Sequence, residues 1–236
     1  MSVRQSKAAG LVWPLALALP ALAILLALGT WQMQRKEWKE DLIAKITART
    51  HQPPVALAEI EKSSAADAEY ARARARGTFR HESEQLLWEP DPKQGPGYHV
   101  YTPLRLADGR FILVNRGYVT EALKSPSSRA AGQLPGEAEI VGLLRFDPDR
   151  DAKGVWYWRD FDGMARAALG ADAGKAVRLF LDAEATPANP GGWPQGGTTR
   201  LTLPNRHLEY ALTWYGLAAT LVAVLIAFIA SRLRAR

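Results

Sequence analysis

The sequence predicts a membrane protein in which two transmembrane helices flank one α+β domain dominated by antiparallel β-sheet. Two uncharged segments, Leu11 to Leu28 and Ala211 to Ala230, are eighteen and twenty residues long. At a helical rise of 1.5 Å per residue they reach about 27 and 30 Å, which matches a hydrocarbon core of about 30 Å. Between them, apolar residues recur mainly with a period of two, which is typical of β-strands.

Composition excludes several classes of chemistry. The chain has 236 residues, of which 47% are apolar and 23% charged, which suits one domain with a hydrophobic core rather than a disordered chain. It has no cysteine. A thiolate zinc site, a Cys-x-x-Cys redox pair, a thioether-bound haem and a thiol nucleophile are therefore excluded.

The positive charge of the chain lies at its ends. Five basic residues stand in the two tails: Arg4, Lys7, Arg232, Arg234 and Arg236. Residues 32–206 hold 25 Lys or Arg and 23 Asp or Glu, so this middle region is nearly neutral. It lacks the basic face that binds phosphates, and we expect no nucleic-acid partner.

The short basic tails predict the topology. Short segments rich in Lys and Arg stay in the cytoplasm, so both termini are expected there, with the middle region translocated across a bacterial inner membrane. The alternative for the first span is a cleaved signal peptide ending near Ala27-Leu28-Gly29. The expected division is a cytoplasmic tail (1–10), a first transmembrane helix (11–30), a periplasmic α+β domain (31–206), a second transmembrane helix (207–230) and a cytoplasmic tail (231–236).

The first span is expected to continue outward as an amphipathic helix. Trp31, Trp38, Leu42 and Ile46 recur at helical spacing, and Pro53-Pro54 ends the pattern. Core packing and an interfacial tryptophan explain this stripe better than a binding role.

Residues 70–80 (YARARARGTFR) are expected to form a β-strand. Alternation places Arg72, Arg74 and Arg76 on one face. Such a row could bind propionates or anionic lipid, but we favour the solvated edge of a sheet, where arginine opposes edge-to-edge pairing.

The remaining elements follow from period and turn residues. Asp108-Gly109 predicts a hairpin between the two strands on either side of it, Phe161 to Leu169 reads as a helix, and Asn189 to Gly197 as a loop. Further strands are expected at Glu84–Glu89, Tyr98–Leu106, Arg110–Val119, Glu137–Phe146, Val177–Ala183 and Thr199–Leu203.

The common motifs of enzymes are absent. The histidines, His51, His81, His99 and His207, lack the spacing of a zinc-binding helix. The sequence has no Gly-x-Ser-x-Gly motif, P-loop or dinucleotide-binding motif. Dispersed carboxylates leave an acid pair open, but the sequence favours a protein that is not an enzyme.

The most distinctive segment is Pro204 to Tyr215 (PNRHLEYALTWY), which leads directly into the second span. Asn205 is expected to cap the helix, with His207 in its first turn, where a neutral imidazole can ligate a metal. Trp214 lies two turns further on the same face, and the small residues Ala211, Gly216 and Ala218 leave space for a flat apolar body. The alternative is an aromatic belt of His207, Tyr210, Trp214 and Tyr215 at the membrane surface.

These residues also resemble a known family. The segment from Asn205 to Tyr215 is similar to the signature of the surfeit-locus family of cytochrome c oxidase assembly proteins. The other similar blocks are Gly29-Thr30-Trp31-Gln32 with Arg35, Trp38 and Lys39; Gly77-Thr78-Phe79; Gly97-Tyr98-His99-Val100; Val114-Asn115-Arg116-Gly117-Tyr118-Val119; Gly142-Leu143-Leu144-Arg145; and Trp156-Tyr157-Trp158-Arg159-Asp160. Arg206 departs from the family, which more often has a second asparagine there.

The resemblance implies a protein that binds haem a and helps to insert it into subunit I of the oxidase. It implies that His207 is the axial ligand of the haem iron and that haem a synthase and the lipid bilayer are partners. Trp214 and Tyr210 are expected to line the haem, and Asn205 and Arg206, or Lys39, to meet its propionates. Arg116 and Asp160 are expected to have structural or partner-contact roles. The rival interpretation is a purely structural scaffold for oxidase subunits that never binds haem.

Overall fold

The computed structural model describes the backbone of residues 6–63, 65–91, 94–146, 160–199, 201 and 203–234. The chain divides into two compact units. One unit contains Met1–Lys45 and Thr202–Arg236, and the other contains Ile46–Leu201. The expected helix after the first span is present, but its residues up to Lys45 group with the second span rather than with the sheet.

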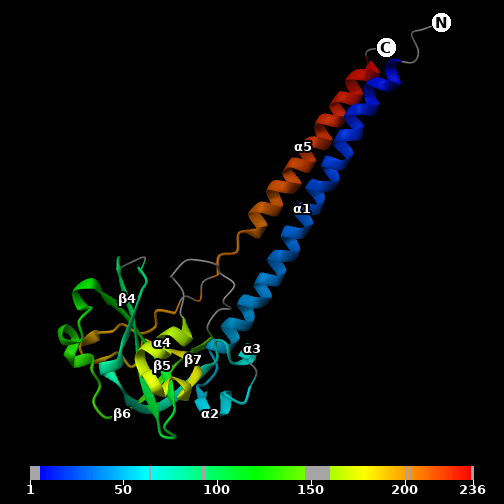
Figure 1. Ribbon diagram of the computed structural model, residues 1–236. Coiled ribbons are helices and arrows are strands. Elements are labelled where there is room, and N and C mark those ends of the chain that lie inside the picture. The colour runs from blue at the N-terminus through cyan, green and yellow to red at the C-terminus, as the bar shows by residue number, and fades with distance from the viewer. Residues whose placement is uncertain are drawn as a thin grey trace. The chain divides into compact units, whose positions relative to one another are not determined.

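Two long helices form the first unit (Figure 1). Helix α1 runs over Ser6–Thr50 and helix α5 over His207–Arg234. Both are long and apolar enough to cross a membrane, as predicted. Helix α1 ends at Thr50, before Pro53-Pro54, because proline lacks the N–H that a helix interior needs.

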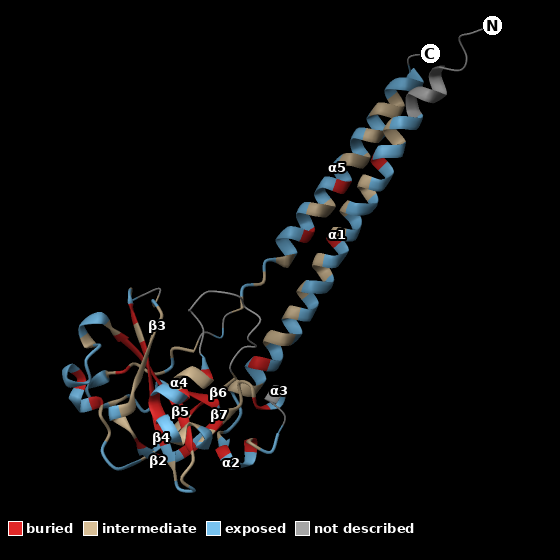
Figure 2. Cartoon of the chain, in the orientation of Figure 1, coloured by how far each residue is buried: buried red, intermediate tan, exposed pale blue. Residues whose placement is uncertain are grey.

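The two helices pack through residues spaced alternately three and four apart, the pattern of a heptad seam. On α5, Ala211 and Ala218 are 0% and 3% exposed, and on α1 Ala18 is 8% exposed. Figure 2 shows short buried bands on both helices, whose other described residues are of intermediate burial or exposed. Because Gln32 contacts His207 while Gly29, earlier in α1, contacts Tyr215, later in α5, the two helices run antiparallel.

Within the described residues, the second unit contains one seven-stranded sheet that closes on itself. The sheet order is β1-β2-β6-β7-β5-β4-β3, and an additional β2–β4 pairing closes a ring of five strands. Neighbours are antiparallel except for β1–β2 and β5–β7. The strands are β1 (Val55–Ala56), β2 (Arg72–Phe79), β3 (Gln85–Trp88), β4 (Gly97–Leu106), β5 (Phe111–Thr120), β6 (Glu137–Arg145) and β7 (Ala176–Ala183).

Both faces of the central strands are buried. One face fills the ring, with β5 contributing Ile112 and Val114 to this core. The alternate residues Phe111 and Leu113 belong to a second cluster on the other face. Helix α4 (Phe161–Leu169) covers that cluster. The unit also contains the short helices α2 (Leu57–Ile60) and α3 (Ala65–Ala68).

Most predicted elements are confirmed, including the hairpin at Asp108-Gly109 and the helix at Phe161–Leu169. The strand expected at Thr199–Leu203 is wrong: Thr199, Leu201 and Leu203 have no strand structure, and residues 200 and 202 lie outside the described residues. Thr199 is held instead by its side chain, whose hydroxyl donates to Asp182 Oδ2 over 2.9 Å.

The arginine row is not on a sheet edge, which corrects our interpretation. Strand β2 pairs with β1, β4 and β6. Arg74 and Arg76 are exposed on the outer face of the ring, while Ala73 and Ala75 point into the core. Arg72 forms an ion pair with Glu184 at 2.6 Å.

Candidate functional site

His207 begins α5 and makes a hydrogen bond to α1. Its Nδ1 lies 2.7 Å from Oε1 of Gln32. An amide oxygen can only accept a hydrogen bond, so Nδ1 carries the proton and donates it. In the neutral tautomer that has this Nδ1 proton, Nε2 is unprotonated, which is the form that can ligate a metal. Among the residues that the structure describes, Nε2 has no hydrogen-bond partner.

The level of this pair along the helices is fixed by a close contact one turn away. Gly29 lies under the ring of Tyr215, and a Cβ added at Gly29 would lie 2.7 Å from Tyr215 Cε1. The Tyr215 hydroxyl is also 3.2 Å from Oγ1 of Thr30. The missing side chain of Gly29 therefore allows the close approach that brings Gln32 to His207.

Two of the three small residues of α5, Ala211 and Ala218, serve a different purpose from the one expected, whereas Gly216 is exposed with nothing within 4 Å of an added Cβ. Ala211 is 0% and Ala218 is 3% exposed, because α1 packs against them. The space that these side chains leave is filled by the neighbouring helix rather than open to a flat ligand.

The structure separates the other predicted site residues. Trp214 is half-buried and shares the α1-facing side of α5 with His207. Tyr210 is 52% exposed and lies on another face. His207 and Trp214 thus share one side of α5, Gln32 of α1 contacts His207, and Tyr210 is not part of this group.

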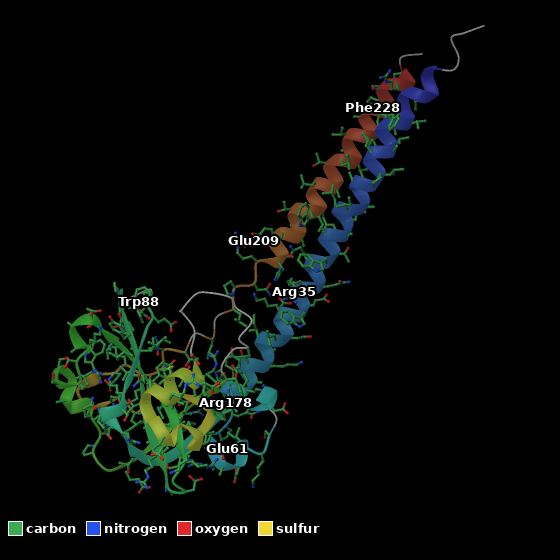
Figure 3. All side chains as sticks on the ribbon, in the orientation of Figure 1. Arg35, Glu61, Trp88, Arg178, Glu209 and Phe228 are labelled. Atoms are coloured by element: carbon green, nitrogen blue, oxygen red, sulfur yellow. The ribbon has the colours of Figure 1, made fainter. Side chains whose placement is uncertain are left out.

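Asn205 is not the residue that caps α5, which differs from the expectation. Helix α5 starts at His207, and the carbonyl of Arg206 accepts from the Tyr210 N–H over 3.3 Å, so Arg206 is the capping position and Asn205 precedes it. The Oδ1 atom of Asn205 is buried without a partner among the described residues, so within this side chain only the Nδ2 amide group can donate to a carboxylate. The Arg206 guanidinium is bound by Glu209 at 2.8 Å. Figure 3 labels Glu209 on α5 and Arg35 on α1.

Gln32 is the site residue that sequence reasoning missed. It was noted within the block Gly29-Thr30-Trp31-Gln32 but given no role. Gln32 lies three residues after Gly29 and therefore on the same side of α1. A polar residue in a helix seam usually pairs with a polar residue of the facing helix, and this could have indicated its role.

In the sheet unit, Arg116 and Asp160 have structural roles. Arg116 is 1% exposed, donates to the Gly132 carbonyl and to Asn189 Oδ1, and lies over the ring of Phe79. Burial lowers the pKa of Arg116 to about 10. Asp160 Oδ1 accepts from the Gly163 N–H over 2.9 Å and caps α4. The rest of its block, 156–159, lies outside the described residues.

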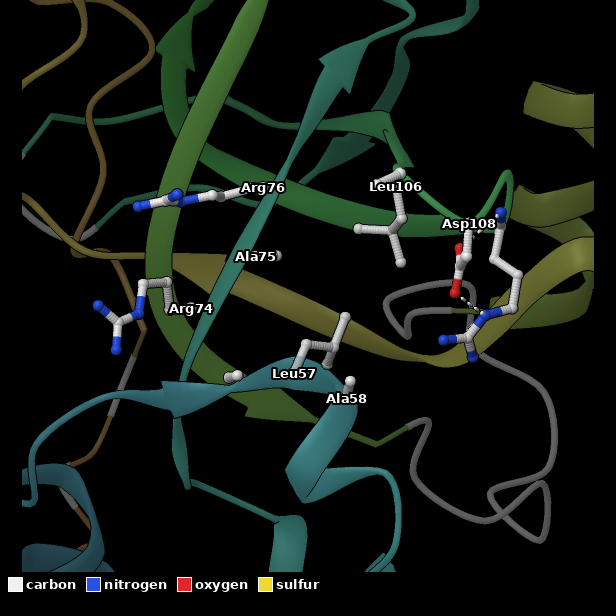
Figure 4. A pocket seen from close by; sticks show the side chains of 10 residues that line it. Leu57, Ala58, Arg74, Ala75, Arg76, Leu106 and Asp108 are labelled. Atoms are coloured by element: carbon white, nitrogen blue, oxygen red, sulfur yellow. Dashed lines mark hydrogen bonds and ion pairs between the residues drawn. The ribbon is translucent and has the colours of Figure 1, made fainter.

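The sheet unit also contains a cavity of about 440 Å³ (Figure 4). Its walls are mainly apolar and include Leu57, Ala75 and Leu106, while Arg74 and Arg76 stand at its rim. Arg76 forms an ion pair with Glu139. The residues that line the cavity include the carboxylate of Asp108, which is paired with Arg110, but no histidine, so the cavity does not replace the histidine site.

Comparison with known proteins agrees with the resemblance. The model of the SURF1 family matches residues 19–219. A SURF1-like protein from Monosiga brevicollis is 37% identical over 243 residues, which cover 95% of this chain and 89% of that protein.

Two vertebrate relatives give the same picture. Surfeit locus protein 1 from Mus musculus is 38% identical, with 86% of this chain and 71% of that protein covered. Surfeit locus protein 1 from Homo sapiens is 37% identical, with coverage of 89% and 74%. These relatives are eukaryotic, so they do not bear out the bacterial source that we expected. The matched length and identity show that the chain belongs to the SURF1 family.

Proposed function

We propose that this protein binds haem a and assists its insertion into subunit I of cytochrome c oxidase, with His207 as the axial ligand. The observation that carries the proposal is the hydrogen bond from Nδ1 of His207 to Gln32. A metal-ligating histidine commonly donates its second ring N–H to an oxygen acceptor, which orients the ring and leaves Nε2 for the metal. The haem is cargo and the proposal requires no turnover.

The depth of His207 also suits haem. Trp13 and Trp31 are 73% and 53% exposed, and they are eighteen residues apart on α1, which is five full turns and about 27 Å. Tryptophan favours the membrane interface, so the two rings would mark the two surfaces of the bilayer. Gln32 follows Trp31, and His207 would lie at the same surface, where a haem can keep its ring in lipid and its propionates in water.

The proposed topology places both basic tails on one side and the sheet unit on the other. In a bacterial inner membrane the sheet unit would be periplasmic. A cysteine introduced at exposed Leu233 would then react only with reagents added from the tail side. Labelling from the opposite side would contradict this arrangement.

In the proposed reaction sequence the protein receives haem a from haem a synthase, holds it through His207, and passes it to the oxidase subunit. Release occurs when the acceptor offers its own ligands to the iron. The sheet unit would dock the acceptor, and the helices would hold the cargo.

The test is the haem content of full-length protein expressed with and without the enzymes of haem a synthesis. We expect coloured protein only with those enzymes, and we expect His207→Ala to lose most of the haem because the iron loses its nitrogen ligand. His51→Ala is the matched control, since His51 also stands at the end of a long helix and its Nδ1 also lies 2.7 Å from an oxygen acceptor, the Thr47 carbonyl. Unchanged haem in His207→Ala would mean that His207 is not the ligand.

A purely structural scaffold for oxidase subunits is the second candidate. It is favoured because two polar side chains at the start of α5 already have partners within the protein: His207 Nδ1 is hydrogen-bonded to Gln32, and the Arg206 guanidinium to Glu209. A scaffold of this kind would be colourless even with abundant haem a and would still copurify with oxidase subunits.

A further inference from the structure

Gln32 is an amide at the end of the apolar part of the α1 seam. Leu25 and Gly29 occupy the preceding seam positions, and Lys36 follows. Its Oε1 atom is 2.7 Å from His207 Nδ1, a contact between residues 175 positions apart in the chain. The helix pair is already held at this level by Gly29 under Tyr215 and by the hydrogen bond between Thr30 and Tyr215.

The chemistry of the amide decides what this contact does. Its oxygen accepts the Nδ1–H and so keeps the proton off Nε2. A carboxylate in the same place would pull harder on the proton and make Nε2 a more basic ligand. A neutral amide orients the ring with a smaller gain in basicity. That combination suits a ligand that must bind iron and later give it up.

We propose that Gln32 is the positioning residue of His207: it fixes the ring tautomer that presents Nε2 to the haem iron, and its neutrality keeps the iron–nitrogen bond weak enough for transfer. This inference rests on the proposed function. It adds a residue on α1 to a ligand on α5, so the binding site exists only when the two helices are paired.

Two substitutions at position 32 should act in opposite directions. Gln32→Leu removes the acceptor, and we expect ferric haem a affinity to fall by about 10-fold to 100-fold, the usual effect of losing such a partner. The midpoint potential of the bound haem should rise and the iron–histidine stretching frequency should fall. Gln32→Glu should tighten ferric haem binding, lower the midpoint potential and slow the loss of haem to excess apomyoglobin.

The experiment titrates haem a into full-length protein in detergent. Tyr215→Phe is the matched control, because it removes a single hydrogen bond between the same two helices, the 3.2 Å contact with Thr30. We expect Tyr215→Phe to leave the potential and the stretching frequency unchanged. A purely structural role for Gln32 would give Gln32→Leu the same spectroscopic values as this control.

The outcomes separate the two proposals. If His207→Ala keeps its haem, the ligand assignment fails and the role of Gln32 fails with it. If His207→Ala loses haem but both Gln32 variants keep the wild-type potential and stretching frequency, the ligand stands and the positioning role is overturned. Opposite shifts in the Leu and Glu variants support it.

Discussion

Replacing Gly29 with alanine tests whether α1 and α5 pack as closely as the structure has them. The new Cβ would lie 2.7 Å from Cε1 and 2.9 Å from Cδ1 and Cζ of Tyr215, well inside normal van der Waals distance. The ring cannot easily turn away, since its hydroxyl is hydrogen-bonded to Thr30. The helices must therefore separate or rotate.

The size of the effect follows from two opposing contributions. Overpacking of this kind costs about 1–3 kcal/mol, whereas replacing a helical glycine by alanine gains about 1 kcal/mol of helix propensity. Gly216→Ala on α5 receives the same gain without a clash, because nothing lies within 4 Å of its added Cβ. The difference between the two variants isolates the contact and should be about 1–3 kcal/mol, or about 5-fold to 150-fold in helix pairing.

Energy transfer between two dyes measures this pairing. The chain has no cysteine, so two cysteines introduced at Val12 and Leu233 would be the only residues labelled by thiol-reactive dyes. Both positions are accessible, at 60% and 58% exposed. We expect Gly29→Ala to lose transfer at a lower SDS concentration than Gly216→Ala, and Tyr215→Ala to abolish that difference. Equal SDS midpoints for the two glycine variants would refute the close packing of Gly29 against Tyr215.

Two further predictions concern the sheet unit. Gly117 has a φ of +115°, and a Cβ added there would lie 1.8 Å from the backbone oxygen of Gln195, so Gly117→Ala should lower the free energy of unfolding by about 2–5 kcal/mol. The control Gly109→Ala should cost about 1 kcal/mol, because Gly109 has a φ of +83° but no close neighbour. Similar denaturation midpoints for the two variants would contradict this prediction. Burial lowers the pKa of His81 below its ordinary 6.5, and the nearby Arg116 charge adds to the shift. As the pH falls below about 6.5, His81 therefore takes up a proton more readily in the unfolded protein than in the folded protein, and the stability that neutral His81 provides is lost. Denaturation from pH 7.5 to 5 should show a flatter decline for His81→Gln, and parallel declines would show that His81 does not titrate as described.

Local elements were predictable because their signals are local. Helix α4 was predicted to the residue, since apolar positions repeat along it and Asp160 caps it. The hairpin at Asp108-Gly109 follows from the left-handed glycine conformation that its turn needs. Sheet order was not predictable, because a period of two identifies one strand and not its partner. Neither the parallel pairing of β5 with β7 nor the pairing of β2 with three other strands was expected.

The candidate site was predictable only on the α5 side. The spacing of His207 and Trp214 places them on one face of any helix. The partner Gln32 depends on how far α1 slides along α5, which is set by the contact of Gly29 with Tyr215. The buried alanines were read as space for a ligand because small residues leave room in one helix, whereas a second helix takes that room in the pair.

The place of β7 in the ring has a consequence for biogenesis. Among the described residues it is the last strand in sequence, yet it lies between β6 and β5. During synthesis of the polypeptide, the edges of β5 and β6 stay open until residue 183 arrives, and unpaired edges invite pairing with other chains. The 23 residues 184–206 separate the end of β7 from the start of α5. Closure of the ring therefore comes only shortly before the second long apolar helix is made, and a delay in closure leaves an aggregation-prone intermediate.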